Sequence, residues 1–184
     1  MLKSILLLMS ALLLLSFGSG EQRIKFKYPK MKEAAFSIPA PKAKFKKEWR
    51  GSDYYYFCEN LKQNIVCSVL FYKLNQEEVK KYIEPIGGLG NAMIALAYFT
   101  VNSPTRSMEK NSSIWGKKDD AFMFRQMDLS PPEDQSIKQK NMFAYGMFGN
   151  DLFVSVHLSK VSCTGEDSLT MRNMLTGIKK KNEQ

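Results

Sequence analysis

The sequence predicts a single α+β domain in which amphipathic helices pack on an antiparallel β-sheet. Paired runs of aromatic and β-branched residues are separated by short polar turns, as in β-hairpins. Segments with apolar residues at helical spacing follow these pairs, and no proline- or glycine-rich linker divides the chain. Strand pairs followed by helices are typical of an antiparallel sheet covered by helices.

Residues 1–20 have the pattern of a cleavable signal peptide. A positive start at Lys3 is followed by a mostly apolar stretch of 13 residues, Ile5 to Phe17, and then by small residues before Glu21. This stretch is shorter than the roughly 20 residues that a membrane-spanning helix needs. The first cysteine is Cys58, so no lipobox cysteine lies near the cleavage point. We therefore expect a periplasmic or secreted protein.

Residues 21–50 form a basic N-terminal segment that precedes the globular part, residues 51–184. The segment has ten basic and three acidic side chains, whereas the rest of the mature chain has a net charge of only +1. Its prolines disfavour regular structure, but Phe36-Ser37-Ile38 is predicted to form a short edge strand. A solvated segment without a partner is one interpretation. The other is a surface for an anionic partner, formed by Lys42, Lys44, Lys46, Lys47 and Arg50.

Two β-rich runs, Asp53–Glu59 and Ile65–Lys73, flank a polar turn and predict a hairpin. A turn centred between Lys62 and Gln63 places Cys58 directly opposite Cys67. Paired residues of antiparallel strands lie close enough for a disulfide, which persists in an oxidising compartment. We therefore predict a Cys58–Cys67 disulfide that leaves Cys163 as the odd thiol.

The middle of the chain is predicted to alternate between helix and strand. Asn75 to Glu78 resembles a capping box, and apolar residues at helical spacing follow it as far as Ile86. The periodicity of Ala92–Val101 fits a buried helix or a strand, and a helix capped by Asn91 is favoured. Residues 102–120 are mostly polar and turn-prone, a strand is predicted over Ala121–Met127, and residues 130–140 are expected to form a charged loop.

The end of the chain has the clearest pattern. Strands are predicted over Asn141–Phe148 and Leu152–Lys160, around a turn at Gly149-Asn150-Asp151. Thr164 and Asp167 then begin a helix with one apolar stripe. Lys179, Lys180 and Lys181 are expected to complement the negative end of that helix.

This order of elements, from the Phe36-Ser37-Ile38-Pro39 strand through the hairpin 141–160 to the closing amphipathic helix, resembles the exported PsbP/DcrB-like proteins. The resemblance covers most of the mature chain. It implies a curved antiparallel sheet between helices. Because members of that group are mainly accessory or binding proteins, it also implies a non-enzymatic role.

Candidate catalytic residues are few. His157 is the only histidine and is expected on the polar surface of its strand, so neither a zinc site nor a catalytic triad is predicted. Cys163 precedes a helix N-terminus, which can lower the pKa of a thiol, but an unpaired, partly buried thiol is the favoured interpretation. No cofactor is expected.

These observations favour an exported, non-catalytic binding or accessory protein. The alternative is a small extracytoplasmic inhibitor or immunity-type protein that blocks a toxin or hydrolase, and an unrecognised hydrolase is a third. The expected partner is an acidic envelope protein or an anionic membrane surface. Aromatic residues beside basic ones also occur in single-stranded nucleic-acid sites, but export argues against that partner.

Overall fold

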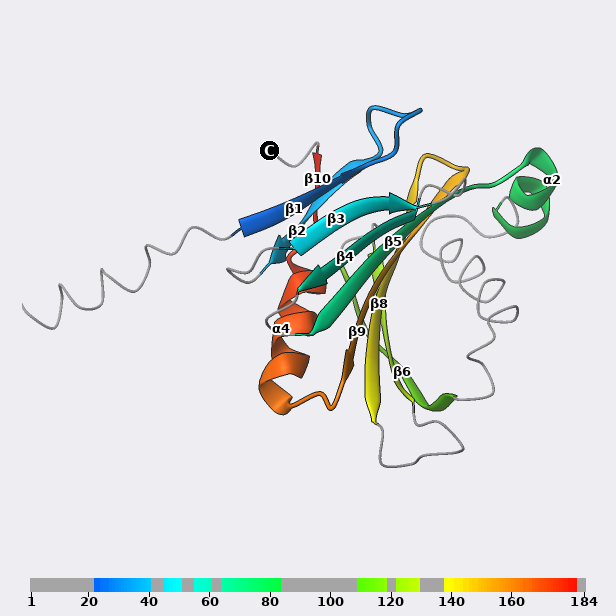
Figure 1. Ribbon diagram of the computed structural model, residues 1–184. Helices are drawn as coiled ribbons and strands as arrows, with labels where there is room; N and C mark the ends of the chain where they lie inside the picture. The colour runs from blue at the N-terminus through cyan, green and yellow to red at the C-terminus, as the bar shows by residue number, and fades with distance from the viewer. Residues whose placement is uncertain are drawn as a thin grey trace, which may run out of the picture.

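The computed structural model describes residues 22–40, 45–50, 55–60, 64–83, 109–118, 122–129 and 138–181, and for the strands within 45–60 and 109–118 it describes the backbone. These residues form two antiparallel sheets, of seven and three strands (Figure 1). The predicted signal peptide and the predicted helix at 92–101 lie outside the described residues.

The larger sheet has the strand order β3-β4-β5-β9-β8-β7-β6. Its strands are β3 (Phe45–Arg50), β4 (Tyr55–Asn60), β5 (Ile65–Lys73), β6 (Glu109–Lys118), β7 (Phe122–Leu129), β8 (Gln139–Phe148) and β9 (Leu152–Val161). Both predicted hairpins, β4–β5 and β8–β9, are confirmed. The hairpin β8–β9 turns at Gly149, whose φ of 60° is a conformation that glycine adopts without steric cost.

The terminal strands β3 and β6 were not predicted. Strand β6 lies where the sequence indicated polar turns, and its pairing with β7 contains two register irregularities. Strand β3 falls within the segment interpreted mainly as basic surface. A strand at the end of an antiparallel sheet pairs through its backbone and does not need an apolar sequence, so the pattern of side chains does not reveal it.

The smaller sheet consists of β1 (Gln22–Lys27), β2 (Ala35–Ala40) and β10 (Lys179–Lys180), with β2 in the middle. The expected strand at Phe36-Ser37-Ile38 is confirmed, but it is a central strand and not an edge. Lys179 and Lys180, which were expected to complement the negative end of the closing helix, also form strand β10 and pair with Ser37 and Phe36 of β2.

The core lies between one face of the large sheet and a second layer made of the small sheet and helix α4 (Gly165–Thr176). Phe36 is central to it, with ring centroids 5.9 Å from Phe71, 6.1 Å from Phe122 and 6.2 Å from Phe148. Helix α4 contributes Met171, Met174 and Leu175, which are all buried. The predicted apolar stripe of this helix therefore packs on the sheet as expected, and the predicted α+β fold is confirmed.

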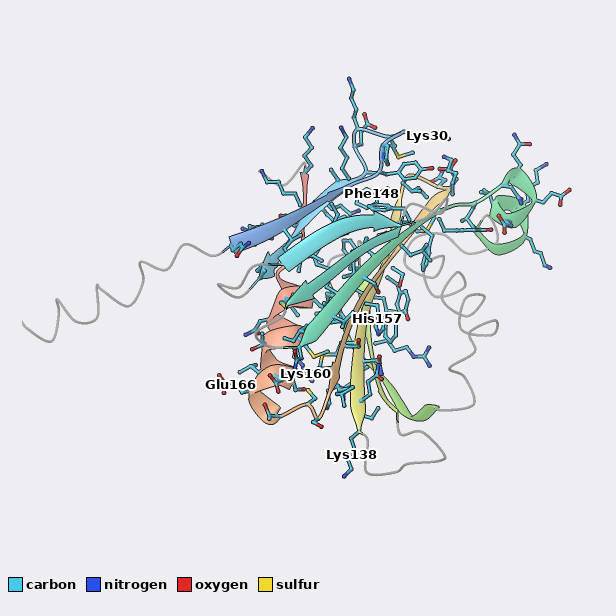
Figure 2. All side chains as sticks on the ribbon, in the orientation of Figure 1. Lys30, Lys138, Phe148, His157, Lys160 and Glu166 are labelled. Atoms are coloured by element: carbon cyan, nitrogen blue, oxygen red, sulfur yellow. The ribbon has the colours of Figure 1, made fainter. Side chains whose placement is uncertain are left out.

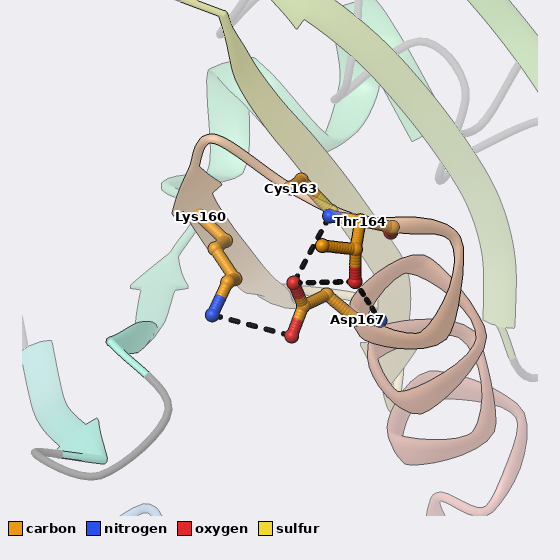
Figure 3. A network of polar contacts seen from close by, with 4 residues as sticks. All are labelled: Lys160, Cys163, Thr164 and Asp167. Carbon is orange, nitrogen blue, oxygen red and sulfur yellow. Dashed lines mark hydrogen bonds and ion pairs between the residues drawn. The ribbon is translucent and has the colours of Figure 1, made fainter.

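The predicted start of helix α4 is confirmed in atomic detail (Figure 3). The Thr164 hydroxyl accepts a hydrogen bond from the Asp167 N–H at 3.2 Å, and the Asp167 carboxylate accepts one from the Thr164 N–H at 3.0 Å. Lys160 forms an ion pair with the same carboxylate at 3.2 Å. Burial alone would raise the pKa of Asp167, but these hydrogen bonds and the lysine lower it overall.

The capping box at Asn75 is also present, and it begins α2 (Gln76–Glu78). The helix does not continue as a regular α-helix, because Val79–Ile83 forms the π-helical segment η1. Tyr72 at the end of β5 donates a hydrogen bond to Glu78 at 2.9 Å, which ties this helical segment to the sheet.

Candidate functional site

The outer face of the small sheet is strongly basic. In β1, Ile24 and Phe26 are buried in the core, whereas the alternate residues Lys25 and Lys27 are exposed. The register places Lys25 opposite Ser37 of β2, and Ser37 opposite Lys179 of β10. Directly opposed residues of antiparallel strands lie on the same face. Two lysines from the two ends of the chain therefore flank one serine.

These residues line a cleft of about 310 Å³, which we call the lysine cleft. Its six lysines come from β1, from the loop between β1 and β2, from β10 and from the residue that follows it. The described lining residues are Lys25, Phe26, Lys27, Lys32, Ala35, Phe36, Ser37, Lys179, Lys180 and Lys181, none of which is acidic. So many like charges around one cleft create a positive potential that attracts anions.

The floor of the lysine cleft is formed by small side chains of the middle strand. Ala35 pairs with Lys27, and Ser37 pairs with Lys25 and Lys179. Ser37 is only 7% exposed, which places it at the bottom between the longer lysine side chains. Small residues in the centre and long cations around them make the outer face of the sheet concave.

Arg23 holds the strands that carry the lysines. Its Nε donates a hydrogen bond to the Ser37 hydroxyl at 3.0 Å, and its Nη2 donates to the carbonyl oxygens of Ser37 at 3.1 Å and Gly177 at 2.7 Å. Gly177 lies in the turn from α4 to β10. One guanidinium thus joins β1, β2 and the turn that sets the position of Lys179.

Lys180 behaves differently from its neighbours. Its Nζ lies 4.9 Å from the ring centroid of Phe148 and 5.9 Å from that of Phe122, within the range of cation–π attraction. It also donates a hydrogen bond to the Met147 carbonyl oxygen at 3.4 Å. Lys180 therefore fastens β10 to the large sheet, while Lys179 and Lys181 remain exposed.

The lysines proposed from the sequence lie elsewhere. Lys46, Lys47 and Arg50 belong to β3, the terminal strand of the large sheet, where Lys46 pairs with Glu59 and Lys47 with Cys58. Lys42 and Lys44 lie outside the described residues. Lys25, Lys27 and Lys32 of the lysine cleft nevertheless come from the basic segment 21–50. Their convergence with Lys179 and Lys181 was missed.

The predicted pairing of Cys58 with Cys67 is confirmed for the backbone, because the two residues are directly opposed in the register of β4 and β5. Cys67 is fully buried. No disulfide bond is present among the residues whose side chains the structure describes, and the side chain of Cys58 is not one of them. The bond itself stays a prediction.

The expectation of an exposed His157 was wrong. The ring is partly buried and stacks on Phe143, with centroids 4.4 Å apart and planes at 6°. Its Nε2 lies 2.8 Å from the Asn141 Oδ1, and its Nδ1 lies 3.4 Å from the Ser68 Oγ. Burial lowers the pKa of His157 from 6.5 to about 4, so the ring is neutral at pH 7.

His157 lies between the Ser68 hydroxyl and the Asn141 amide. The base of an acyl-transfer triad lies in the same way between the nucleophile and the residue that orients it. However, Ser68 lies within β5, which is paired on one side with β4 and on the other with β9. The N–H groups of such a strand form the hydrogen bonds of the sheet instead of pointing at a reacting oxygen. These three residues therefore form a polar network within the sheet.

The thiol of Cys163 is not activated. Burial and the nearby Asp167 carboxylate raise its pKa, opposite to the effect that a helix N-terminus would have. Its Sγ lies 3.5 Å from the Thr164 carbonyl oxygen, beside the helix cap (Figure 3). A protonated thiol is a weak nucleophile, which agrees with the favoured interpretation of Cys163 as a partly buried thiol.

Among the residues that the structure describes, no three histidine, cysteine, aspartate or glutamate residues are grouped as metal ligands would be. No helix in the same part of the chain is both long and apolar enough to cross a membrane.

No family model and no curated protein sequence matches the chain. Among solved structures, the chain is similar to cyanobacterial PsbP from Synechocystis, with 11% identity, a TM-score of 0.52, and coverage of 89% of this chain and 95% of that one. It is also similar to the Ran-binding protein Mog1p of Saccharomyces cerevisiae, with 9% identity, a TM-score of 0.46, and coverage of 84% and 85%. The chain therefore shares the α+β fold of PsbP, which the order of its elements predicted.

Proposed function

We propose that the chain is an exported, non-catalytic binding or accessory protein that binds an anionic partner in the lysine cleft. The observation that carries this proposal is the convergence of exposed lysines from the two ends of the chain around one cleft, namely Lys25, Lys27, Lys32, Lys179 and Lys181. Positive charges gathered around a concave floor create a positive potential that attracts an anion.

The internal structure of the cleft supports binding more than simple solvation of charge. Arg23 donates three hydrogen bonds that hold β2 and the turn before β10 in place. Lys180 anchors β10 from the opposite face through Phe148 and Met147. The lysines are thus displayed on a sheet held from both sides, so less freedom is lost when a partner binds.

The partner is an acidic envelope protein or an anionic membrane surface in the periplasmic or extracellular space. The electrostatic contribution near an anionic surface is about 1 kcal/mol for each basic residue. Such attraction weakens with salt, because the Debye length falls from about 10 Å at 0.1 M to about 3 Å at 1 M. Binding through the lysine cleft therefore decreases strongly as salt is added.

The test compares three variants with the exported parent protein. The cleft variant K25Q/K179Q removes the two lysines that flank Ser37. The control variant K80Q/K138Q removes the same charge from exposed positions outside the cleft lining, and Figure 2 shows Lys138 at the end of the molecule opposite Lys30. A third variant, with Lys42, Lys44, Lys46 and Lys47 changed to Gln, tests the surface that the sequence indicated.

Each protein is sedimented with anionic and with neutral vesicles and is passed over an immobilised acidic protein, at 0.05 to 1 M salt. We expect the parent and the control variant to bind at least one anionic surface at low salt, and the cleft variant to bind it far less. Equal binding by parent and cleft variant would reject the lysine cleft. Loss of binding only in the third variant would move the site to β3 and the residues before it.

A further inference from the structure

The arrangement of the lysines also indicates which anionic group the cleft accepts. We propose, building on the proposed function, that the lysine cleft is a site for a compact, multiply charged phosphate group, carried either by a small soluble molecule or by a lipid headgroup. Three features of the cleft support this ligand class over carboxylates: the spacing of the lysines, the choice of lysine over arginine, and the size of the cavity.

The spacing follows from the sheet. Lys25 and Lys179 lie on the two strands that flank β2, so their Cα atoms are about 10 Å apart, while Lys27 is about 7 Å from Lys25 along β1. Lys181 lines the cleft on the side of β10. Four flexible ammonium groups around a gap of this size reach one small group in its centre from opposite sides.

The type of cation favours phosphate. The planar fork of arginine matches carboxylate and phosphate alike, whereas lysine binds an anion as a point charge that can approach it from any direction. Arg23 is the arginine that the described residues place beside the cleft, and its Nε and Nη2 donate to Ser37 and Gly177. The cations that line the cleft are all lysines, which suit a group with several charged oxygens pointing in different directions.

The size of the cavity favours a small ligand. Its volume of about 310 Å³ lies at the lower end of the range for small-molecule pockets, roughly 300–1,000 Å³. The Ser37 hydroxyl on its floor accepts a hydrogen bond from Arg23, so its own hydrogen can be donated to an anion above it. A concave site with a donor at its base fits a protruding phosphate better than a flat anionic surface.

The experiment uses the exported protein and four anionic probes. Calorimetric titration with inorganic tripolyphosphate tests the soluble source, and co-sedimentation with phosphatidic acid vesicles, against phosphatidylcholine vesicles, tests the lipid source. Titration with citrate and with poly-glutamate measures the binding of carboxylates at matched ionic strength. Each measurement is repeated with K25Q/K179Q and K80Q/K138Q, and thermal unfolding confirms that both variants are folded.

We expect tripolyphosphate or phosphatidic acid vesicles to bind the parent and the control variant alike, and the cleft variant about thirtyfold more weakly, since each lysine contributes roughly a factor of five. Binding of the vesicles alone identifies a lipid headgroup. Carboxylates that bind as tightly as the phosphates, with the same loss in the cleft variant, overturn the phosphate assignment and leave the proposed function standing. Failure of every anion to bind overturns both.

Discussion

The guanidinium Nη2 of Arg23 lies 2.7 Å from the carbonyl oxygen of Gly177, a residue 154 positions later in the chain. This contact joins the first strand of the fold to the turn before the last one. It sets the position of β10, and with it the lysines that the C-terminus contributes to the cleft.

Changing Arg23 to Gln is expected to remove these hydrogen bonds and to lower the free energy of unfolding by about 2 kcal/mol, because charge-assisted hydrogen bonds of partly buried groups are worth roughly 1.5–3 kcal/mol. Amide hydrogen exchange in residues 177–181 should accelerate. The control is Lys25→Gln, an exposed neighbour on the same strand that loses the same charge. If both variants unfold at the same temperature and exchange alike, Arg23 does not hold β10.

Gly177→Ala is expected to destabilise the protein by about 1–3 kcal/mol, as overpacking does elsewhere. A methyl group there would collide with the Pro39 Cγ and lie 2.9 Å from the Asn173 carbonyl oxygen. Gly165→Ala is the matched control, since its added Cβ would meet no atom within 4 Å. Chemical denaturation should leave this control within about 0.5 kcal/mol of the parent. Equal stability of the two variants would contradict the close approach of Gly177 to β2.

The Cys58–Cys67 disulfide is expected in protein recovered from an oxidising compartment, because β4 and β5 place the two residues directly opposite each other. Non-reducing peptide mapping should join the peptides that contain them and leave Cys163 as a thiol. Reduction should then lower the free energy of unfolding by about 2–4 kcal/mol. A map that links Cys163 to either of the other two cysteines would refute this pairing.

His157 is expected to make stability depend on pH between about 4 and 6.5. Burial lowers the pKa of His157 to about 4 from 6.5, so in this range the unfolded chain binds a proton that the folded protein does not. The contribution of His157 to the free energy of unfolding is therefore fully present above pH 6.5. It is lost as the pH falls towards 4, and the loss is on the order of 3 kcal/mol.

The chain has one histidine, so its imidazole gives a single set of NMR resonances to follow. These should show no titration between pH 7 and pH 5, and His157→Gln should weaken the dependence of stability on pH in this window. A titration midpoint near 6.5 in the folded protein would show that the ring is not buried as the structure places it.

Some of the fold could be predicted because it depends on contacts between residues close in sequence. The hairpin β8–β9 is specified by alternating residues and a glycine turn, and the capping boxes at Asn75 and Thr164 each involve residues three positions apart. The register of β4 and β5 followed from the length of the turn between them, which is why the opposition of Cys58 and Cys67 was correctly predicted.

Other features have a pattern in the sequence whose meaning becomes clear only when the pairing of the strands is known. The alternation of Arg23, Ile24, Lys25, Phe26 and Lys27 is that of a half-buried strand, but its high charge and the prolines that follow favoured an irregular basic segment. The burial of His157 depends on Phe143 and on the strands beside it, so its place on the polar side of its strand did not reveal that burial.

The sequence by itself therefore determined the α+β class, the hairpins, the helix starts and the excess of positive charge in residues 21–50. Only the tertiary structure decided where part of that charge gathers. Strand β2 pairs with β1 on one side and β10 on the other, and this brings Lys25 and Lys179 to the two sides of Ser37. The physical reason is that local hydrogen bonds and side-chain periodicity are encoded within a few residues, whereas the pairing of the two chain ends depends on the core that both of them cover.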